Sequence, residues 1–242
     1  MNNNVDTLIE FLSFDLWNSD KIFNKFKEVR NNIYREGEQY GERFLYIEGS
    51  RKNKVVLVAH TDTVFTDTTD KHELLINNNI ISNKYNDLGC GIGADDRAGC
   101  AILWLLRNSG HSILIVDGEE MGCIGSSWLM DNNKDIANKI NSHMFMIGFD
   151  RRGSNDYKCY DVGNKKFRKY IENNYIGYKE PDRYSYSDIA VLCDKICGVN
   201  LSVGYYNEHT ANEYIKINEW ENTLKITERF LMNENKIIKH KL

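Results

Sequence analysis

The sequence predicts an α/β fold: a three-layer α/β/α sandwich around a mixed, mostly parallel sheet. Four short, nearly continuous apolar runs have the composition of strands buried on both faces, at residues 54–59, 112–116, 144–149 and 199–203. Segments with apolar residues at helical spacing alternate with these strands, which is the pattern of an α/β domain. No internal repeat or low-complexity linker interrupts the pattern, so residues 1–242 are expected to form one domain.

The other elements follow from apolar spacing and from turn and cap residues. Near the N-terminus we expect a helix over residues 5–16, a second helix that begins after the Ser19-Asp20 cap, and a strand over residues 43–48. Later in the chain we expect a hairpin at 73–83, helices at 97–108, 134–144 and 165–172, a short strand at 157–160, a helix start at Asp188 and a last helix over 218–237.

Composition and charge exclude several classes of function. The chain has 242 residues and a net charge of −4, with charges of both signs spread along it, so nucleic acid is not an expected partner. No apolar run approaches the roughly 18 residues of a membrane helix, and residues 1–6 lack the features of a signal peptide. We therefore expect no membrane partner, a cytoplasmic location and six reduced cysteines.

An acidic pair, Asp95-Asp96, lies where a glycine-rich run meets the apolar helix at 97–108. Two adjacent carboxylates repel each other unless positive charge is near. Arg97 and the helix N-terminus can supply that charge, which gives a structural interpretation of the pair as an acidic cap. The alternative is that one carboxylate binds a metal ion, and this stretch alone does not decide between the two.

Polar side chains follow each of the four predicted buried strands. They are His60 and Asp62, then Glu119 and Glu120, then Asp150, and after the fourth strand His209. Because ligands of parallel α/β sheets bind beyond the carboxyl ends of the strands, these residues are expected to meet at one edge. Imidazoles and carboxylates together form a ligand set suited to zinc, with enough groups for two ions.

Five motifs carry a resemblance to a known group of families. They occur in family order between residues 60 and 213: His60-Thr61-Asp62-Thr63-Val64, Gly93-Ala94-Asp95-Asp96-Arg97-Ala98-Gly99, Glu119-Glu120-Met121-Gly122, Asp150-Arg151-Arg152-Gly153 and His209-Thr210-Ala211-Asn212-Glu213. The set resembles the co-catalytic zinc exopeptidases, which include tripeptide aminopeptidase-like, leucyl and glutamyl aminopeptidase-like and acylamino-acid deacylase-like families. The resemblance implies their zinc-exopeptidase-like (phosphorylase/hydrolase-like) fold.

The resemblance also implies a role for each motif residue. Five residues would bind two divalent metal ions, with Asp95 between the ions, His60 and Asp150 on one, and Glu120 and His209 on the other. Glu119 would be the general base, and Asp62 would hold the far nitrogen of His60. Asp96 is expected to support the fold rather than bind metal. The ions are expected to be Zn²⁺, with Mn²⁺ or Co²⁺ as alternatives.

Substrate contacts are predicted from position alone. Tyr205 and Tyr206, just before His209, are candidates to stabilise an oxyanion, although aromatic packing is the more common role of such residues. Asp188 resembles a family residue near the active site, and an N-cap is the alternative role. Arg151, together with Arg152, is a candidate to bind a substrate carboxylate, and surface ion pairing is its alternative.

The leading hypothesis is a metal-dependent hydrolase, an aminopeptidase that acts on short peptides. Many relatives insert a lid domain, but the segment between Asp150 and Ser187 is too short for one, so we expect a single catalytic domain over residues 1–242. One alternative is an amidohydrolase or deacylase that acts on N-acyl amino acids. An alternative of another class is an inactive metal-binding scaffold, although such a scaffold needs neither Glu119 nor Asp62. The sequence leaves the oligomeric state open.

Overall fold

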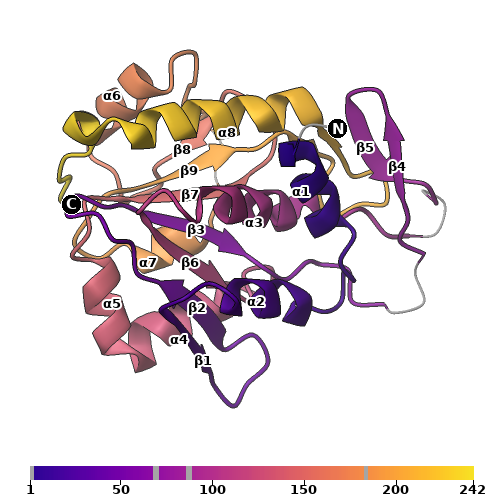
Figure 1. Ribbon diagram of the computed structural model, residues 1–242, viewed down its shortest axis with the longest axis horizontal. Coiled ribbons are helices and arrows are strands. Elements are labelled where there is room, and N and C mark those ends of the chain that lie inside the picture. Colours follow the sequence, from indigo (N-terminus) through magenta and orange to yellow (C-terminus); the bar gives the residue numbers. More distant parts are fainter. Residues whose placement is uncertain (1–2, 68–70, 86–88, 183–184) are drawn as a thin grey trace.

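A seven-stranded sheet forms the centre of the molecule (Figure 1). The computed structural model describes residues 3–67, 71–85, 89–182 and 185–242. The strand order is β1 (Asn32–Glu36), β2 (Arg43–Ile47), β6 (Ser112–Val116), β3 (Val56–His60), β7 (Met146–Arg151), β9 (Gly198–Ser202), β8 (Tyr157–Lys158). The central strands β6, β3, β7 and β9 are parallel, and the flanking strands are antiparallel, so the predicted mixed, mostly parallel sheet is confirmed.

Helices cover both faces of this sheet and complete the predicted three layers (Figure 1). One face packs against α1 (Asn3–Leu12), α2 (Asp20–Lys27), α3 (Ala94–Leu106), α6 (Lys165–Asn174) and α8 (Ile217–Met232). The other packs against α4 (Ile124–Asn132), α5 (Lys134–Ile140) and α7 (Asp188–Leu192). Because side chains alternate along a strand, Leu57 and Ala59 join the first core and Val56 and Val58 the second.

The register of the parallel strands brings their carboxyl ends to one edge. His60 at the end of β3 pairs with Val116 at the end of β6, and Val58 pairs with Gly148 of β7. The residues that follow these strands therefore leave the sheet side by side. The sequence predicts this edge as the place where the candidate site residues meet.

A second, four-stranded sheet has the order β10-β11-β5-β4. The predicted hairpin is confirmed as β4 (Leu74–Asn77) and β5 (Ile80–Asn83), and it stands at one end of the molecule (Figure 1). Strands β10 (Tyr205–Tyr206) and β11 (Tyr214–Lys216) were not predicted, and β11 pairs with β5. The loop that carries His209 connects β10 to β11, so the hairpin anchors this loop from a distant part of the chain.

Several element bounds differ from the prediction, and tertiary contacts explain the clearest case. Helix α1 ends at Leu12 rather than at residue 16, because the carbonyls of Phe14 and Asp15 accept hydrogen bonds from the buried guanidinium of Arg97. Helix α8 ends at Met232, and a short 3-10 turn, Glu234–Lys236, follows it. Strand β1 and helix α4 were missed. None of the helices in the described ranges is both long and apolar enough to cross a membrane.

Candidate metal centre

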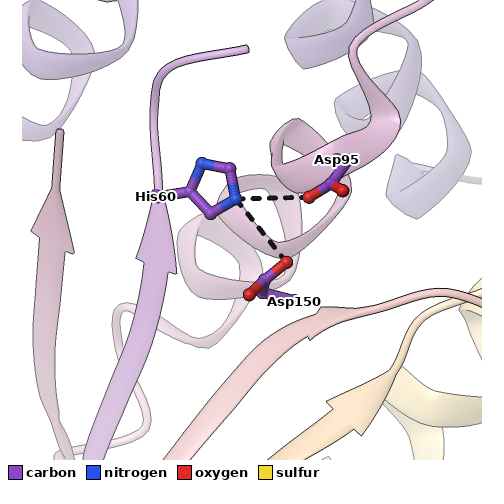
Figure 2. A group of neighbouring side chains, drawn as sticks. All are labelled: His60, Asp95 and Asp150. Atoms are coloured by element: carbon purple, nitrogen blue, oxygen red, sulfur yellow. Dashed lines mark hydrogen bonds and ion pairs between the residues drawn. The ribbon is translucent and has the colours of Figure 1, made fainter. Parts of the chain in front are cut away.

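His60 lies at the centre of a group of carboxylates. Its Nε2 atom is 3.2 Å from Asp95 Oδ1 and 3.5 Å from Asp150 Oδ1 (Figure 2). Its Nδ1 atom is 3.3 Å from Asp62 Oδ1, on the opposite side of the ring. The structure thus places Asp62 at the far nitrogen of His60, where the sequence analysis expects it. The His60 side chain is almost completely buried, so few orientations are open to it.

His209 forms the second half of the cluster. Its Nε2 atom lies 2.9 Å from Glu120 Oε1 and 3.2 Å from Asp95 Oδ2. Asp95 therefore directs one carboxylate oxygen toward His60 and the other toward His209. A carboxylate in this position can contact two ions at once. About half of the His209 side chain is exposed, so this part of the cluster is open to a ligand.

Asp62 also connects the first strand end to the second. Its two carboxylate oxygens accept hydrogen bonds from the backbone N–H groups of Glu119 and Glu120, each at 3.1 Å. The Glu119 Oε2 atom lies 4.0 Å from His60 Nε2. The Asp62 side chain thus contacts both the far nitrogen of His60 and the loop that carries the predicted base, as a residue behind a metal ligand would.

The geometry of these groups fits metal binding. Ligand atoms held about 2.0 Å from a tetrahedral zinc ion are about 3.3 Å apart. The distances between the Nε2 atoms of the two histidines and the carboxylates of the three acidic predicted ligands are 2.9–3.5 Å. Glu120 Oε1 is buried and receives no hydrogen bond from any described residue, although His209 Nε2 is close. His209 Nε2 and Glu120 Oε1 are thus close together without a hydrogen bond, which is the arrangement expected of two atoms that bind the same metal ion. Three overlapping groups have ligand atoms within 4.8 Å: His60, Asp95 and Asp150; His60, Glu119 and Glu120; Asp95, Glu120 and His209.

The charges of the cluster also favour bound cations. Burial, and next the charge of Asp150, raises the pKa of Glu119 to about 10. Burial and the charge of Asp95 likewise raise the pKa of Asp150. The carboxylates of Asp95 and Glu120, both close to His209 Nε2, raise the pKa of His209 to about 11. The carboxylates therefore hold more negative charge than the two histidines balance, and divalent ions would restore the ionised form of Glu119 that a general base needs.

Asp150 is held by three hydrogen-bond donors. Its Oδ2 accepts from Ser187 Oγ at 2.7 Å and from Asn200 Nδ2 at 3.3 Å, and its Oδ1 accepts from Tyr205 OH at 3.2 Å. Asn200 was missed by the sequence analysis. It is a buried polar residue in the otherwise apolar run Val199-Asn200-Leu201, and such an interruption is the signal that points to it.

The glycine-rich stretch before Asp95 is held by Glu213. This buried carboxylate accepts hydrogen bonds from the backbone N–H groups of Ile92 at 2.8 Å, Gly93 at 2.7 Å and Asp95 at 3.2 Å. A Cβ atom at Gly91 would lie 2.4 Å from Glu213 Oε2, so only glycine fits there. The sequence analysis included Glu213 in a motif but gave it no role, and the structure shows that it positions the backbone of Asp95.

We expect Glu213→Ala to weaken metal binding by roughly tenfold or more, because the backbone that carries Asp95 loses all three acceptor contacts. Titration with a competing chelator measures the affinity. The exposed Glu234→Ala variant serves as the control and should bind metal like the wild type. Wild-type affinity in Glu213→Ala would show that this carboxylate does not position Asp95.

Asp96 faces the fold rather than the cluster. It is fully buried, and its Oδ1 accepts a hydrogen bond from the N–H of Gly99 at 3.0 Å while its Oδ2 accepts from the N–H of His60 at 3.3 Å. Asp95 and Asp96 have non-helical backbone angles, so the regular helix begins at Arg97. Asp96 thus caps α3 and attaches it to the end of β3, which is the supporting role expected from the sequence.

A cavity of about 400 Å³ opens beside the cluster. Two of the four predicted substrate contacts, Tyr205 and Arg151, are among its lining residues, and two are not. Asp188 is buried and accepts a hydrogen bond from Ser126 Oγ at 2.6 Å. The Tyr206 hydroxyl donates to Glu219 at 2.6 Å, and its ring stacks on another tyrosine. These contacts favour structural roles for Asp188 and Tyr206.

The two arginines that line the cavity are already paired with carboxylates. Arg151 Nε and Nη2 donate to Asp156 at 2.6 and 3.2 Å. Arg152 Nη1 donates to Glu208 at 2.7 Å. Glu208 was missed by the sequence analysis, although it directly precedes His209. Its Oε2 atom has no hydrogen-bond donor among the described residues.

Comparisons with known proteins identify related sequences and folds. The sequence profile of peptidase family M28 matches residues 45–190, which is more than half of the chain. No curated protein sequence matches the chain. Among solved structures, the aminopeptidase PepT from Bacillus cereus superposes with a TM-score of 0.68 at 14% identity, over 97% of this chain and 98% of that chain. A tripeptidase from Staphylococcus aureus superposes with a TM-score of 0.66 at 14% identity, over 98% of this chain and 97% of that chain. The TET1 peptidase of Pyrococcus horikoshii superposes with a TM-score of 0.65 at 12% identity, over 96% of this chain and 100% of that chain. That peptidase is described as able to assemble into a tetrahedron or a large octahedral shell.

Proposed function

The chain belongs to peptidase family M28 and is a metal-dependent peptidase, and we propose that it is an aminopeptidase that uses two divalent metal ions, most simply zinc, to remove the N-terminal residue of short peptides. The five predicted ligands come from the ends of β3, β6 and β7, the start of α3 and the loop between β10 and β11. Asp95 lies between the two histidines, which supports an arrangement with two ions.

The pairing of both cavity arginines is the observation that favours an aminopeptidase over a deacylase. An enzyme that acts on N-acyl amino acids needs a cation in the cavity beside the cluster, because the free carboxylate of its substrate lies only one residue from the scissile bond. Arg151 is engaged by Asp156, and Arg152 by Glu208. In contrast, Glu208 keeps one carboxylate oxygen without a donor, next to the predicted ligand His209. A site with spare negative charge is better suited to a free α-ammonium group.

The proposed chemistry divides between the ions and the side chains. When bound, the ions supply Lewis-acid charge that polarises the peptide carbonyl and makes water a better nucleophile. Glu119, the proposed general base, takes the proton from the attacking water and passes it to the departing amine. Asp62 keeps the Nδ1 proton of His60 in place, so that its Nε2 faces the carboxylates. Tyr205 and Asn200 hold Asp150 in a fixed orientation.

A panel of matched peptides tests the proposed substrate class. Each sequence is supplied with a free amino end, with an N-acetyl group, and with a free amino end and an amidated carboxyl end. We expect release of the N-terminal residue from both free-amine forms and none from the acetylated form, with amino acid release as the measurement. A preference for acetylated substrates would replace the aminopeptidase with the deacylase, and a metal-loaded protein that cleaves none of them would favour the inactive scaffold.

Two further parts of the proposal concern organisation and location. Between β7 and α7 the described residues form only β8 and α6, which supports a single catalytic domain over residues 1–242. All six cysteines are buried, and none forms a disulfide with another described residue, which suits a reducing compartment such as the cytoplasm.

A further inference from the structure

A second cavity, of about 630 Å³, adjoins the cavity beside the metal cluster. The two cavities share four lining residues: Tyr160, Pro181, Ser185 and Tyr186. The second one is larger, extends toward β8, α6 and the start of α7, and contains none of the predicted metal ligands. It is therefore a space that opens from the site without belonging to the metal centre.

We propose that this second cavity binds the residues that follow the scissile bond of a peptide, and that Lys158 receives the carboxylate at the end of that peptide. This inference rests on the proposed aminopeptidase function. An aminopeptidase holds one residue on the amino side of the scissile bond, and every further residue lies on the other side. The larger cavity adjoins the smaller one at the cluster and provides space for these further residues of the peptide.

The junction between the cavities is built from residues with fixed contacts. The Tyr160 hydroxyl accepts a hydrogen bond from Asn200 Nδ2 at 3.1 Å, and Asn200 also donates to Asp150. The Tyr160 carbonyl accepts from Arg168 Nη2 at 2.7 Å. The junction wall is therefore tied on one side to the predicted metal ligand and on the other to α6. A peptide that passes Tyr160 would be aligned with the cluster by the same hydrogen-bond network.

Lys158 is the cation of this cavity that is available for a carboxylate. Arg168 is already paired with Glu180, at 2.6 Å. The Lys158 ammonium donates to the Pro181 carbonyl at 3.1 Å, and within the described ranges it has no ion pair with a carboxylate. The two other acidic residues of the lining, Asp161 and Asp182, are exposed, so water and salt screen their charges. A half-buried ammonium without an anionic partner favours a ligand with a free carboxylate.

The test compares substrates that do and do not extend into the second cavity. The short probe is the amino acid p-nitroanilide that the wild type cleaves fastest. The long probes are di-, tri- and tetrapeptides with the same first residue, each with a free and with an amidated carboxyl end. We expect the wild-type kcat/KM to rise about tenfold from the dipeptide to the longer peptides. We also expect a free carboxyl end to be preferred to the amide by about fivefold.

Two variants assign these effects to the cavity. Ala190→Phe fills the second cavity and should lower kcat/KM for the tri- and tetrapeptide about tenfold more than for the p-nitroanilide. Lys158→Met should remove the preference for a free carboxyl end while keeping the rise with length. Ser109→Phe, which changes a residue of a separate cavity near Leu231, is the matched control and should keep the wild-type selectivity. Melting temperatures establish that all three variants fold.

The outcomes separate this inference from the proposed function. If the wild type cleaves the p-nitroanilide and all peptide lengths equally well, and Ala190→Phe changes all of them alike, the second cavity does not bind peptide. If Lys158→Met keeps the preference for a free carboxyl end, the assignment of Lys158 is wrong. If the metal-loaded wild type cleaves no free-amine substrate of any length, the aminopeptidase function itself is wrong.

Discussion

Glu119→Gln is expected to lower kcat for peptide hydrolysis by roughly 10²- to 10⁴-fold, which is the usual contribution of a positioned general base. The amide keeps the size of the side chain but has no carboxylate to accept a proton. Glu119 lies beside the cluster, with its Oε2 atom 4.0 Å from His60 Nε2, and it is not one of the five predicted ligands. Metal content should therefore stay at the wild-type value. Steady-state kinetics and elemental analysis of the same preparation measure both effects.

Glu120→Gln is the matched control for this experiment. The two residues are neighbours, and both backbone N–H groups are held by Asp62. Glu120, however, approaches His209 with a buried oxygen that has no donor. We expect this variant to lose metal affinity. If Glu119→Gln loses the metal and Glu120→Gln keeps it, the two roles are exchanged, and a Glu119→Gln enzyme with wild-type kcat would remove Glu119 from the mechanism.

Removal of divalent metal is expected to abolish hydrolysis and to lower the melting temperature by about 5–10 °C. An ion present at a hundred times its dissociation constant stabilises the folded state by about 2.7 kcal/mol. For a chain of this size each kcal/mol corresponds to about 2–4 °C. The physical reason is the crowding of Asp95, Glu120 and Asp150 beside two histidines, which the ions compensate.

The measurement is a chelator treatment followed by the return of metal. Elemental analysis of the untreated protein should give close to two equivalents, and Zn²⁺, Mn²⁺ or Co²⁺ should restore both activity and melting temperature. Adding Mg²⁺, which prefers oxygen ligands and keeps much of its water, is the control and should restore little. Full activity or an unchanged melting temperature in the metal-free protein would contradict the predicted metal centre.

The parallel centre of the sheet could be predicted because each of its four strands is a nearly continuous apolar run. Such runs are stable only when both faces are covered, and they reveal the layers without any knowledge of partners. The strands β1, β10 and β11 could not be found in this way. Residues 32–36 are half-buried or exposed, and three of these five residues are polar or charged. Strands β10 and β11 have only two and three residues. Their pairing energy comes from neighbouring strands rather than from their own composition.

The predicted ligands lie in short motifs at or near the ends of strands and at the start of α3, so their types and order are visible in the chain. The residues that hold them are not, because the contacts join distant segments. Glu213 reaches the backbone of Asp95, and Asn200 reaches Asp150, from positions that carry no spacing signal toward those partners. A hydrogen bond between distant segments depends on how the strands are ordered in the sheet.

The tertiary structure also decides which of the predicted substrate contacts face the cavity. Tyr205 and Arg151 line the cavity. In contrast, Asp188 accepts a hydrogen bond from Ser126, and Tyr206 donates one to Glu219. The direction of a side chain near a site depends on one or two backbone angles and on which partner lies within reach. Sequence position narrows the candidates to a neighbourhood but does not choose among them.

By itself the sequence determined the sandwich, its parallel centre and the set of imidazoles and carboxylates at one sheet edge, because strand periodicity and strand ends are local properties of the chain. Only the tertiary structure decided that Asp95 lies between His60 and His209, that both cavity arginines are neutralised, and that a second cavity opens past Tyr160. Distances, ion pairs and cavities arise where segments far apart in sequence pack together, and that packing is set by the free energy of the whole fold rather than by any single segment.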